Sequence, residues 1–302
     1  MKQQRNLKLM AKELPEDLVT QILQWLPVVS LLHFKCICKS WYALITHQYV
    51  IRKHLLHNKK NNNTHLLLKM FNRTTNSYVI STLSYETLQV SLTQRAPPPF
   101  LGIDKEMCVV GSCNGLVCLH NNSYYEFNVV IWNFATKETK VVPKSNLPRL
   151  SSGHCSRYEV IGFGFDAKTN EYKISNLLSL YDPNSFQSEL CSLSANSWRE
   201  VDSPPCVIRA DFRGIDSYIN GMASWEASLD DWEGVLTFHM SDEVFLKTPL
   251  PDDVIYYNWR YFFWLNESIA MAVSIYEWLL LEVGVKDSWT KLFTIGPFTR
   301  ID

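Results

Sequence analysis

The feature that most restricts the fold of this chain is a dense helical pattern over residues 14–56. Apolar residues recur there at helical spacing, at Leu18, Val19, Ile22, Leu23 and Leu26. Such spacing places the side chains on one stripe of a 3.6-residue helix. Pro15 suits the first helical turn, where its missing N–H would be unpaired anyway, and Pro27 ends the helix. The pattern predicts an amphipathic helix.

Two or three more helices are expected before residue 56. Ser30 can cap a second helix, and helical spacing continues into a third and a fourth that begins near Thr46. The apolar positions of the second and third helices are Leu31, Leu32, Phe34, Cys38, Trp41, Leu44 and Ile45. A unit of roughly forty residues is close to the size below which a domain struggles to bury enough surface. We therefore expect this module to bind a partner.

This helical segment resembles the F-box, in which LP, a D-L-x-x-x-I-L helix and a second LP precede S-L-x-x-F-x-C-x-C-K-S-W. In that family the motif docks on the Skp-type adaptor of a cullin-RING ubiquitin ligase. The matching positions, which the resemblance implies bind the adaptor, are Leu14, Pro15, Leu18, Ile22, Leu26, Pro27, Leu31, Phe34, Cys38, Lys39 and Trp41. Without the resemblance, the same residues fit the core of a small helical domain equally well.

Charge is distributed unevenly along the chain. Residues 1–60 contain ten Lys and Arg against three Asp and Glu, whereas residues 201–302 contain seven against sixteen, so these segments carry +7 and −9. The basic residues of the first segment are interspersed with apolar helix positions rather than gathered in a run. We therefore expect no nucleic-acid partner.

Secretion, membrane insertion and metal binding are not expected. Residues 1–13 lack the apolar segment of a secretory signal, and two glutamates interrupt the most apolar run, 268–285. The eight cysteines form no CxxC pair and no histidine spacing completes a zinc site. We predict reduced, mostly buried thiols in an intracellular protein, cytoplasmic or nuclear, without a metal or other cofactor.

After residue 56 the pattern changes from helices to hairpins. The polar, Asn-rich residues 57–65 are expected to be a linker. Beyond them, short runs of Val, Ile, Leu, Tyr and Phe alternate with polar turns, and a Trp recurs after Ser or Asn as an anchor between a strand edge and the core. The later hairpins follow one another at intervals of 45–46 residues, which suits one propeller blade. An irregular β-propeller or a stack of hairpins explains this repetition better than a sandwich.

The hairpin region, residues 66–295, resembles the F-box-associated interaction domain of plant F-box proteins, including S-locus F-box proteins. The resemblance lies in GSCNGLVCL, IWNFATKE, GFGFDAKTNEYKI and NSWREV. Family members usually continue further, so we expect the closing blade to be incomplete. We therefore expect an α+β multidomain fold. It comprises an N-terminal extension at residues 1–13, a helical segment resembling the F-box at 14–56, the linker at 57–65, and an all-β, propeller-like domain at 66–302.

No catalytic motif is present: a GxSxG elbow, an HExxH pair, a Walker loop and a complete GxGxxG are all missing. Gly162 and Gly164 are interpreted as strand glycines that permit close packing. The acidic C-terminal third also carries aromatic residues, a combination that suits recognition of a protein. The candidate target-binding residues are Trp225, Asp230, Asp231, Trp232 and Glu233. Solubility for the carboxylates and core packing for the aromatics remain open for each of them.

The resemblances imply a non-catalytic substrate receptor of an SCF (Skp-cullin-F-box) ubiquitin ligase. Its partners would be the adaptor, through it the cullin and RING subunits, and a target protein that is basic if the acidic third binds it. The S-locus resemblance implies pollen recognition through a cationic secreted ribonuclease. Two alternatives stay open: a truncated paralogue without a target, and a ligand-binding or enzymatic propeller with a helical cap.

Overall fold

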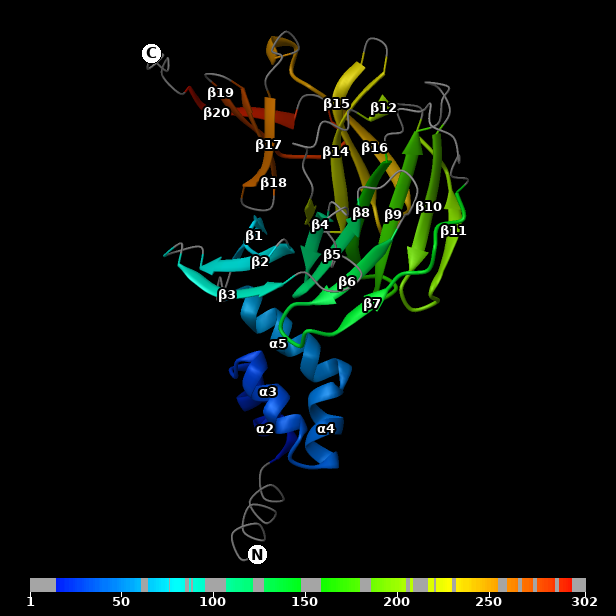
Figure 1. The fold of residues 1–302 in the computed structure, drawn as a ribbon. Coiled ribbons are helices and arrows are strands. Elements are labelled where there is room, and N and C mark those ends of the chain that lie inside the picture. Colours follow the sequence, from blue (N-terminus) through cyan, green and yellow to red (C-terminus); the bar gives the residue numbers. More distant parts are fainter. Residues whose placement is uncertain are drawn as a thin grey trace, which may run out of the picture. The chain divides into compact units, whose positions relative to one another are not determined.

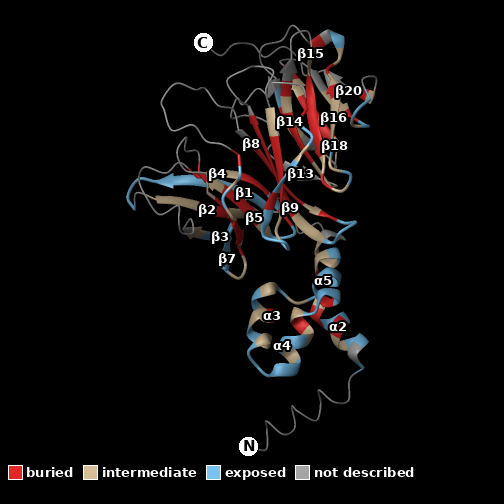
Figure 2. Cartoon of the chain, turned by 90° about the vertical axis from the view of Figure 1, so that its right-hand side faces the viewer, coloured by how far each residue is buried: buried red, intermediate tan, exposed pale blue. Residues whose placement is uncertain are grey.

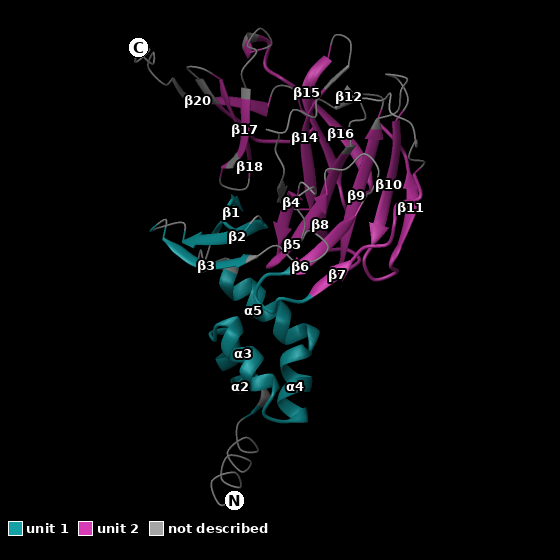
Figure 3. Ribbon diagram, in the orientation of Figure 1, with its two compact units in different colours: residues 1–102, 133–138 teal, residues 103–132, 139–302 magenta. Residues whose placement is uncertain are grey.

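The computed structural model describes residues 15–60, 65–75, 77–84, 87, 89–95, 107–121, 128–147, 159–179, 186–204, 207–208, 217–219, 221–229, 232–254, 260–265, 268–273, 276–285 and 288–294. The chain divides into two compact units (Figure 3). Unit 1 comprises residues 1–102 and 133–138, and unit 2 comprises residues 103–132 and 139–302.

The described part of unit 1 begins with four helices (Figure 1). They are α2 (Glu16–Gln24), α3 (Val28–Lys35), α4 (Lys39–Thr46) and α5 (Gln48–Lys60). Pro15 and Pro27 are the N-cap residues of α2 and α3, with extended ψ angles of 140° and 147°. The prediction that Ser30 caps the second helix is wrong, because the helix already begins at Val28 and Pro27 sets the direction of entry.

The four helices pack around a small apolar core (Figure 2). Its buried members are Leu23, Leu31, Ile45 and Val50, and its partly buried members are Val19, Leu26, Phe34, Trp41 and Leu44. The predicted single apolar stripe of α2 is in fact two neighbouring stripes, because Leu23 is fully buried while Ile22, one residue away, is 53% exposed. One stripe makes the core and the other lies at the surface.

Helix α5 continues through Lys60, and strand β1 begins at His65, whereas the sequence predicts a linker over 57–65. Residues 48–60 contain no Pro or Gly, and Asn58 Nδ2 lies 3.1 Å from His54 Nδ1, one turn earlier. The helix therefore takes up the first residues of the predicted linker.

The described residues that follow form five antiparallel sheets, one in unit 1 and four in unit 2. The unit 1 sheet contains β1 (His65–Asn72), β2 (Ser77–Ser84) and β3 (Val90–Arg95). The second sheet contains β4 (Met107–Cys113), β5 (Leu116–Asn121), β6 (Val129–Asn133) and β7 (Thr139–Val141). The third contains β8 (Glu159–Asp166), β9 (Glu171–Ser179), β10 (Phe186–Ser192) and β11 (Ser197–Val201).

The last two sheets are separated by a short 3-10 helix, η1 (Asp252–Val254). The fourth sheet contains β12 (Val207–Ile208), β13 (Ser217–Ile219), β14 (Met222–Leu229), β15 (Trp232–His239) and β16 (Val244–Pro249). The fifth contains β17 (Arg260–Leu265), β18 (Ser268–Val273), β19 (Tyr276–Leu280) and β20 (Trp289–Thr294). The chain is therefore a small helical module followed by five propeller blades, which confirms the predicted fold class.

Five hairpin turns share one local design. Each begins with a side chain that accepts a hydrogen bond from a backbone N–H two or three residues on: Asn72, Asn133, Asp166, Ser192 and His239. Four of these turns end in a residue with positive φ, at Lys137, Asn170, Asn196 and Glu243. Short polar side chains that satisfy turn amides explain why these polar segments form hairpins.

Three apolar layers join consecutive sheets of unit 2. The first lies between the β4–β7 and β8–β11 sheets and includes Cys118, Phe163 and Trp198. The second joins the β8–β11 sheet to the β12–β16 sheet, and the third joins the β12–β16 sheet to the β17–β20 sheet. Each sheet in the middle of this series is thus buried on both faces, which accounts for strands that are apolar on both sides.

Gly162 marks the closest approach between two of these sheets. A Cβ placed there would lie 2.6 Å from the Cβ of Ala223 and 2.9 Å from the Trp225 ring. Real Cβ atoms do not approach other atoms so closely, so only glycine permits this packing. The interpretation of Gly162 as a close-packing strand glycine is confirmed.

Candidate functional site

Helix α2 presents an apolar stripe to solvent. Leu18, Ile22 and Trp25 follow at i, i+4 and i+7 and are 45%, 53% and 68% exposed. The neighbouring stripe, with Val19 and Leu23, packs in the helical core. A helix that is apolar on two stripes and buries only one has an exposed apolar face, and such a face indicates a binding surface.

The predicted adaptor-binding residues fall into three groups. Leu18 and Ile22 are exposed, as are Pro15, Pro27, Cys38 and Lys39. Leu31 is buried and Leu26, Phe34 and Trp41 are partly buried in the helical core. Leu14 lies outside the described residues. The structure brings together Phe34 and Trp41, whose ring centroids are 5.4 Å apart, but as core rather than surface.

The exposed apolar residues that the sequence prediction missed include Trp25, Val29 and Ile37. Their side chains are 68%, 58% and 62% exposed. Trp25 could have been found, because it lies three residues after Ile22 and so extends the same stripe. Ile37 could not, since it lies in the three-residue connection between α3 and α4, where no helical periodicity applies.

His54 fixes helix α5 against the end of α2. Its Nε2 lies 2.9 Å from the carbonyl oxygen of Leu26, and Asn58 Nδ2 lies 3.1 Å from its Nδ1. In the tautomer that fits both partners, Nε2–H donates to the carbonyl and Nδ1 accepts from the amide. Leu26 lies just after α2, whose C-cap residue is Trp25. The contact with His54 therefore holds α5 beside the segment that connects α2 to α3.

Comparisons with known proteins identify both parts of the chain. A family model described as the F-box domain matches residues 12–53, and a model described as the F-box associated beta propeller domain matches residues 68–258. This chain is an F-box protein with an F-box associated β-propeller domain. Proteins of this family are non-catalytic components of SCF ubiquitin ligases, and an F-box domain implies binding to a Skp-type adaptor.

Curated relatives of this F-box protein occur in Arabidopsis thaliana. It is 29% identical to F-box/kelch-repeat protein At3g23880 over 301 residues, covering 95% of this chain and 80% of the relative. It is 26% identical to F-box protein At3g07870, covering 95% and 73%, and 27% identical to F-box protein At1g11270, covering 77% and 73%. Plant F-box proteins are therefore its relatives, and an assignment to the S-locus group remains a prediction.

The predicted target-binding residues of this F-box protein do not form one surface among the described residues. Trp225 is only 4% exposed and packs between the third and fourth sheets. Trp232 and Glu233 are partly exposed at the start of β15, and Lys247 Nζ lies 5.4 Å from the Trp232 ring centroid. Asp230 and Asp231 lie outside the described residues. Target binding by this group stays a prediction.

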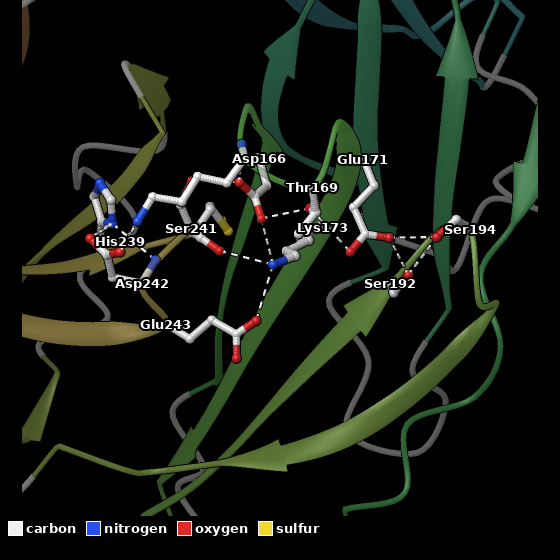
Figure 4. Close-up of polar contacts among 12 residues, drawn as sticks. Asp166, Thr169, Glu171, Lys173, Ser192, Ser194, His239, Ser241, Asp242 and Glu243 are labelled. Carbon is white, nitrogen blue, oxygen red and sulfur yellow. Dashed lines mark hydrogen bonds and ion pairs between the residues drawn. The ribbon is translucent and has the colours of Figure 1, made fainter.

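The most concentrated polar cluster of unit 2 joins two hairpin turns (Figure 4). Lys173 on β9 uses all three ammonium hydrogens, donating to Asp166 at 2.7 Å, Glu243 at 3.0 Å and the Met240 carbonyl at 3.1 Å. Glu243 also pairs with Arg199. Burial alone would raise the pKa of Asp166, but hydrogen bonds from Lys173, Ser241 and Thr169 outweigh it and hold the pKa well below its ordinary value.

This cluster has the character of a structural clamp rather than of an active site. Lys173 and Asp166 are almost fully buried, and both are saturated with partners from the protein itself. The part of the chain that the structure describes contains no group of three or more His, Cys, Asp or Glu placed to hold a metal. None of its helices combines the length and apolar character that crossing a bilayer requires.

Proposed function

We propose that this F-box protein is the substrate-recognition subunit of an SCF ubiquitin ligase. Its helical module binds a Skp-type adaptor, and its β-domain binds a target protein. The protein does no chemistry itself. By holding the target on the same assembly as the ubiquitin-transferring subunit, it makes the transfer effectively intramolecular, which raises the effective concentration of the target.

The observation that carries this proposal is the exposed α2 stripe of Leu18, Ile22 and Trp25 within a segment matched by the F-box domain model. Three large apolar side chains on one helix face gain free energy only if a partner removes them from water, at roughly 25 cal/mol per Å² of apolar area. Aromatic residues such as Trp25 contribute disproportionately to interface free energy. The stripe therefore suits the docking of an apolar groove on the adaptor.

The experiment is co-purification and calorimetric titration of the full chain with a purified Skp-type adaptor. Ile22→Asp forces an unpaired charge into the contact and should weaken binding by at least ~30-fold. Gln24→Asp is the matched control, because it adds the same charge to a partly exposed position of α2 that lies off the stripe. Leu26→Asp is a poorer variant, since Leu26 packs in the core and its loss would unfold the module. Wild-type affinity for Ile22→Asp would refute the proposal.

We propose that the target protein is basic. The net charge of −9 over residues 201–302 favours association with positive surfaces and predicts a rate that falls with salt. The S-locus resemblance makes a cationic secreted ribonuclease the first protein to test. The measurement is binding of that ribonuclease, in low and high salt, to the chain already complexed with adaptor. Adaptor binding without any target would favour the alternative of a paralogue that has lost its target.

A further inference from the structure

Helix α5 buries one face and leaves the opposite face in solvent. Val50 and His54, on the buried face, are 3% and 7% exposed. The exposed face consists of Tyr49, Arg52, Lys53 and Leu56, spaced at i, i+3, i+4 and i+7 so that they form one continuous stripe. Two of these four side chains are apolar or aromatic and two are cationic. Helices that dock in protein grooves present residues at this spacing.

The charge of this region has one sign. Between Leu18 and Tyr85 the sequence contains eight Lys and Arg and not a single Asp or Glu. The surrounding segment thus supplies no carboxylate for Arg52 or Lys53. Lys53 instead lies over the ring of Tyr49, with its Nζ 5.5 Å from the ring centroid. Such cation–π contact keeps the ammonium at the surface and leaves its charge available to a partner.

The α5 stripe is continuous with the exposed stripe of α2. Lys53 is followed one turn later by His57, and the His57 ring meets the Trp25 ring edge-on with centroids 4.1 Å apart. Trp25 is the last member of the α2 stripe and remains 68% exposed despite this contact. A row from Tyr49 through Lys53 and His57 to Trp25 therefore connects the two faces within unit 1.

We propose that the adaptor that docks on the α2 stripe extends over the α5 stripe and presents carboxylates to Arg52 and Lys53. This inference rests on the proposed function and names the chemistry of its partner surface. The two stripes then have different roles. Burial of apolar side chains on α2 slows dissociation, whereas the cations of α5 steer the approach of an acidic adaptor surface and speed association.

The two apolar or aromatic side chains of the α5 stripe are Tyr49 and Leu56, and Ile51, which is also exposed, lies off the stripe. They give too little apolar surface on one face for insertion into a lipid bilayer. Two cations on the stripe are likewise few compared with the six to ten phosphate contacts on which strong nucleic-acid binding depends. A protein surface that combines carboxylates with shallow apolar contacts is the better match.

The test is the association kinetics of the full chain with a purified Skp-type adaptor, at about 50 mM and about 500 mM salt. Arg52→Glu with Lys53→Glu should lower the association rate constant by ~10-fold at low salt and change the dissociation rate by less than about twofold. The difference should shrink at high salt. Neutralisation by Arg52→Gln and Lys53→Gln should give an intermediate effect. Glu and Gln form helices nearly as well as Arg and Lys, so α5 should remain folded.

The matched control is Arg73→Glu with Lys144→Glu, two exposed cations outside the helices. It changes the net charge equally and should leave the association rate within about twofold of wild type. An unchanged rate for the α5 double variant, or an equal fall in the control, would overturn the inference. Loss of binding by Ile22→Asp in the same assay would still support the proposed function, so failure of the inference and failure of the function are distinguishable.

Discussion

The indole N–H of Trp198 donates to the backbone carbonyl oxygen of Pro143 at 2.7 Å, across 55 residues of sequence. Trp289 repeats the arrangement with the carbonyl of Pro249 at 2.8 Å. In both cases a Trp on the last strand of one blade holds the end of the preceding blade, since Pro143 follows β7 and Pro249 ends β16. Both Trp side chains are buried. The sequence-based prediction that a Trp after Ser anchors a strand edge to the core is confirmed here.

Trp198→Phe should lower the free energy of unfolding of unit 2 by about 1 kcal/mol, because the Pro143 carbonyl loses its hydrogen bond while most of the packing remains. For a unit of this size the melting temperature should fall by about 2–4 °C. Trp232→Phe is the control: the indole nitrogen of Trp232 is buried without a hydrogen-bond partner, so its removal should be neutral or stabilising. An equal fall in melting temperature for the two variants would contradict this account.

Asp166→Asn should destabilise unit 2 by about 3 kcal/mol at pH 7, because Lys173 would remain buried beside a neutral partner. The low pKa of the Asp166 carboxyl also sets a pH dependence. The ionised Asp166 contributes its full stabilisation to the folded state above the pKa of an unfolded Asp, about 3.9. This stabilisation is lost as the pH falls toward the lower pKa of the folded state.

Thermal melts between pH 7 and pH 2 measure both effects. The wild type should lose stability steeply below about pH 4, and Asp166→Asn should show a shallower loss. Asp242→Asn is the control, since Asp242 is half exposed and pairs with exposed Lys168. If the melting temperatures of the wild type and of Asp166→Asn fell in parallel below about pH 4, Asp166 would not be the cause of the pH dependence.

Gly162→Ala should destabilise the contact between the third and fourth sheets by about 2 kcal/mol, because the new Cβ would overlap Ala223 and the Oγ of Ser175. Adding Ala223→Gly to this variant should recover part of the loss, since it removes one of the overlapping atoms. The measurement is a double-mutant cycle of melting temperatures. Strict additivity of the two substitutions would argue against direct contact.

Thiol reactivity should separate the cysteines into two classes. Cys36 and Cys38 are exposed, so the prediction of mostly buried thiols is wrong for the helical module. Burial, reinforced by nearby Cys191, raises the pKa of Cys118 far above its ordinary value, and burial raises the pKa of Cys191 to about 11. Alkylation at pH 8 followed by peptide mass spectrometry should label Cys36 and Cys38 first. Adaptor binding should slow their labelling under the proposed function, whereas equal labelling of Cys118 would contradict the buried state.

The helices and hairpins could be predicted because their causes are local. A helix face follows from a spacing of three to four residues, and a hairpin follows from a turn that begins with Asn, Asp or Ser and satisfies its own amides. Ser30 shows the limit of such rules: it is a good cap by residue type, but Pro27 already fixes where the helix begins. The F-box and propeller resemblances rest on this same local patterning.

Only the tertiary structure decided which apolar residues face solvent. Ile22 and Leu23 are adjacent and chemically alike, and what separates them is that α3, α4 and α5 pack on one side of α2. Trp225 has the composition of a recognition residue, yet it is buried against Gly162, 63 positions earlier in the sequence. Likewise Lys173 finds Asp166 and Glu243 on two different sheets. Periodicity fixes the direction of a side chain relative to its own element, whereas burial depends on what other elements bring opposite to it.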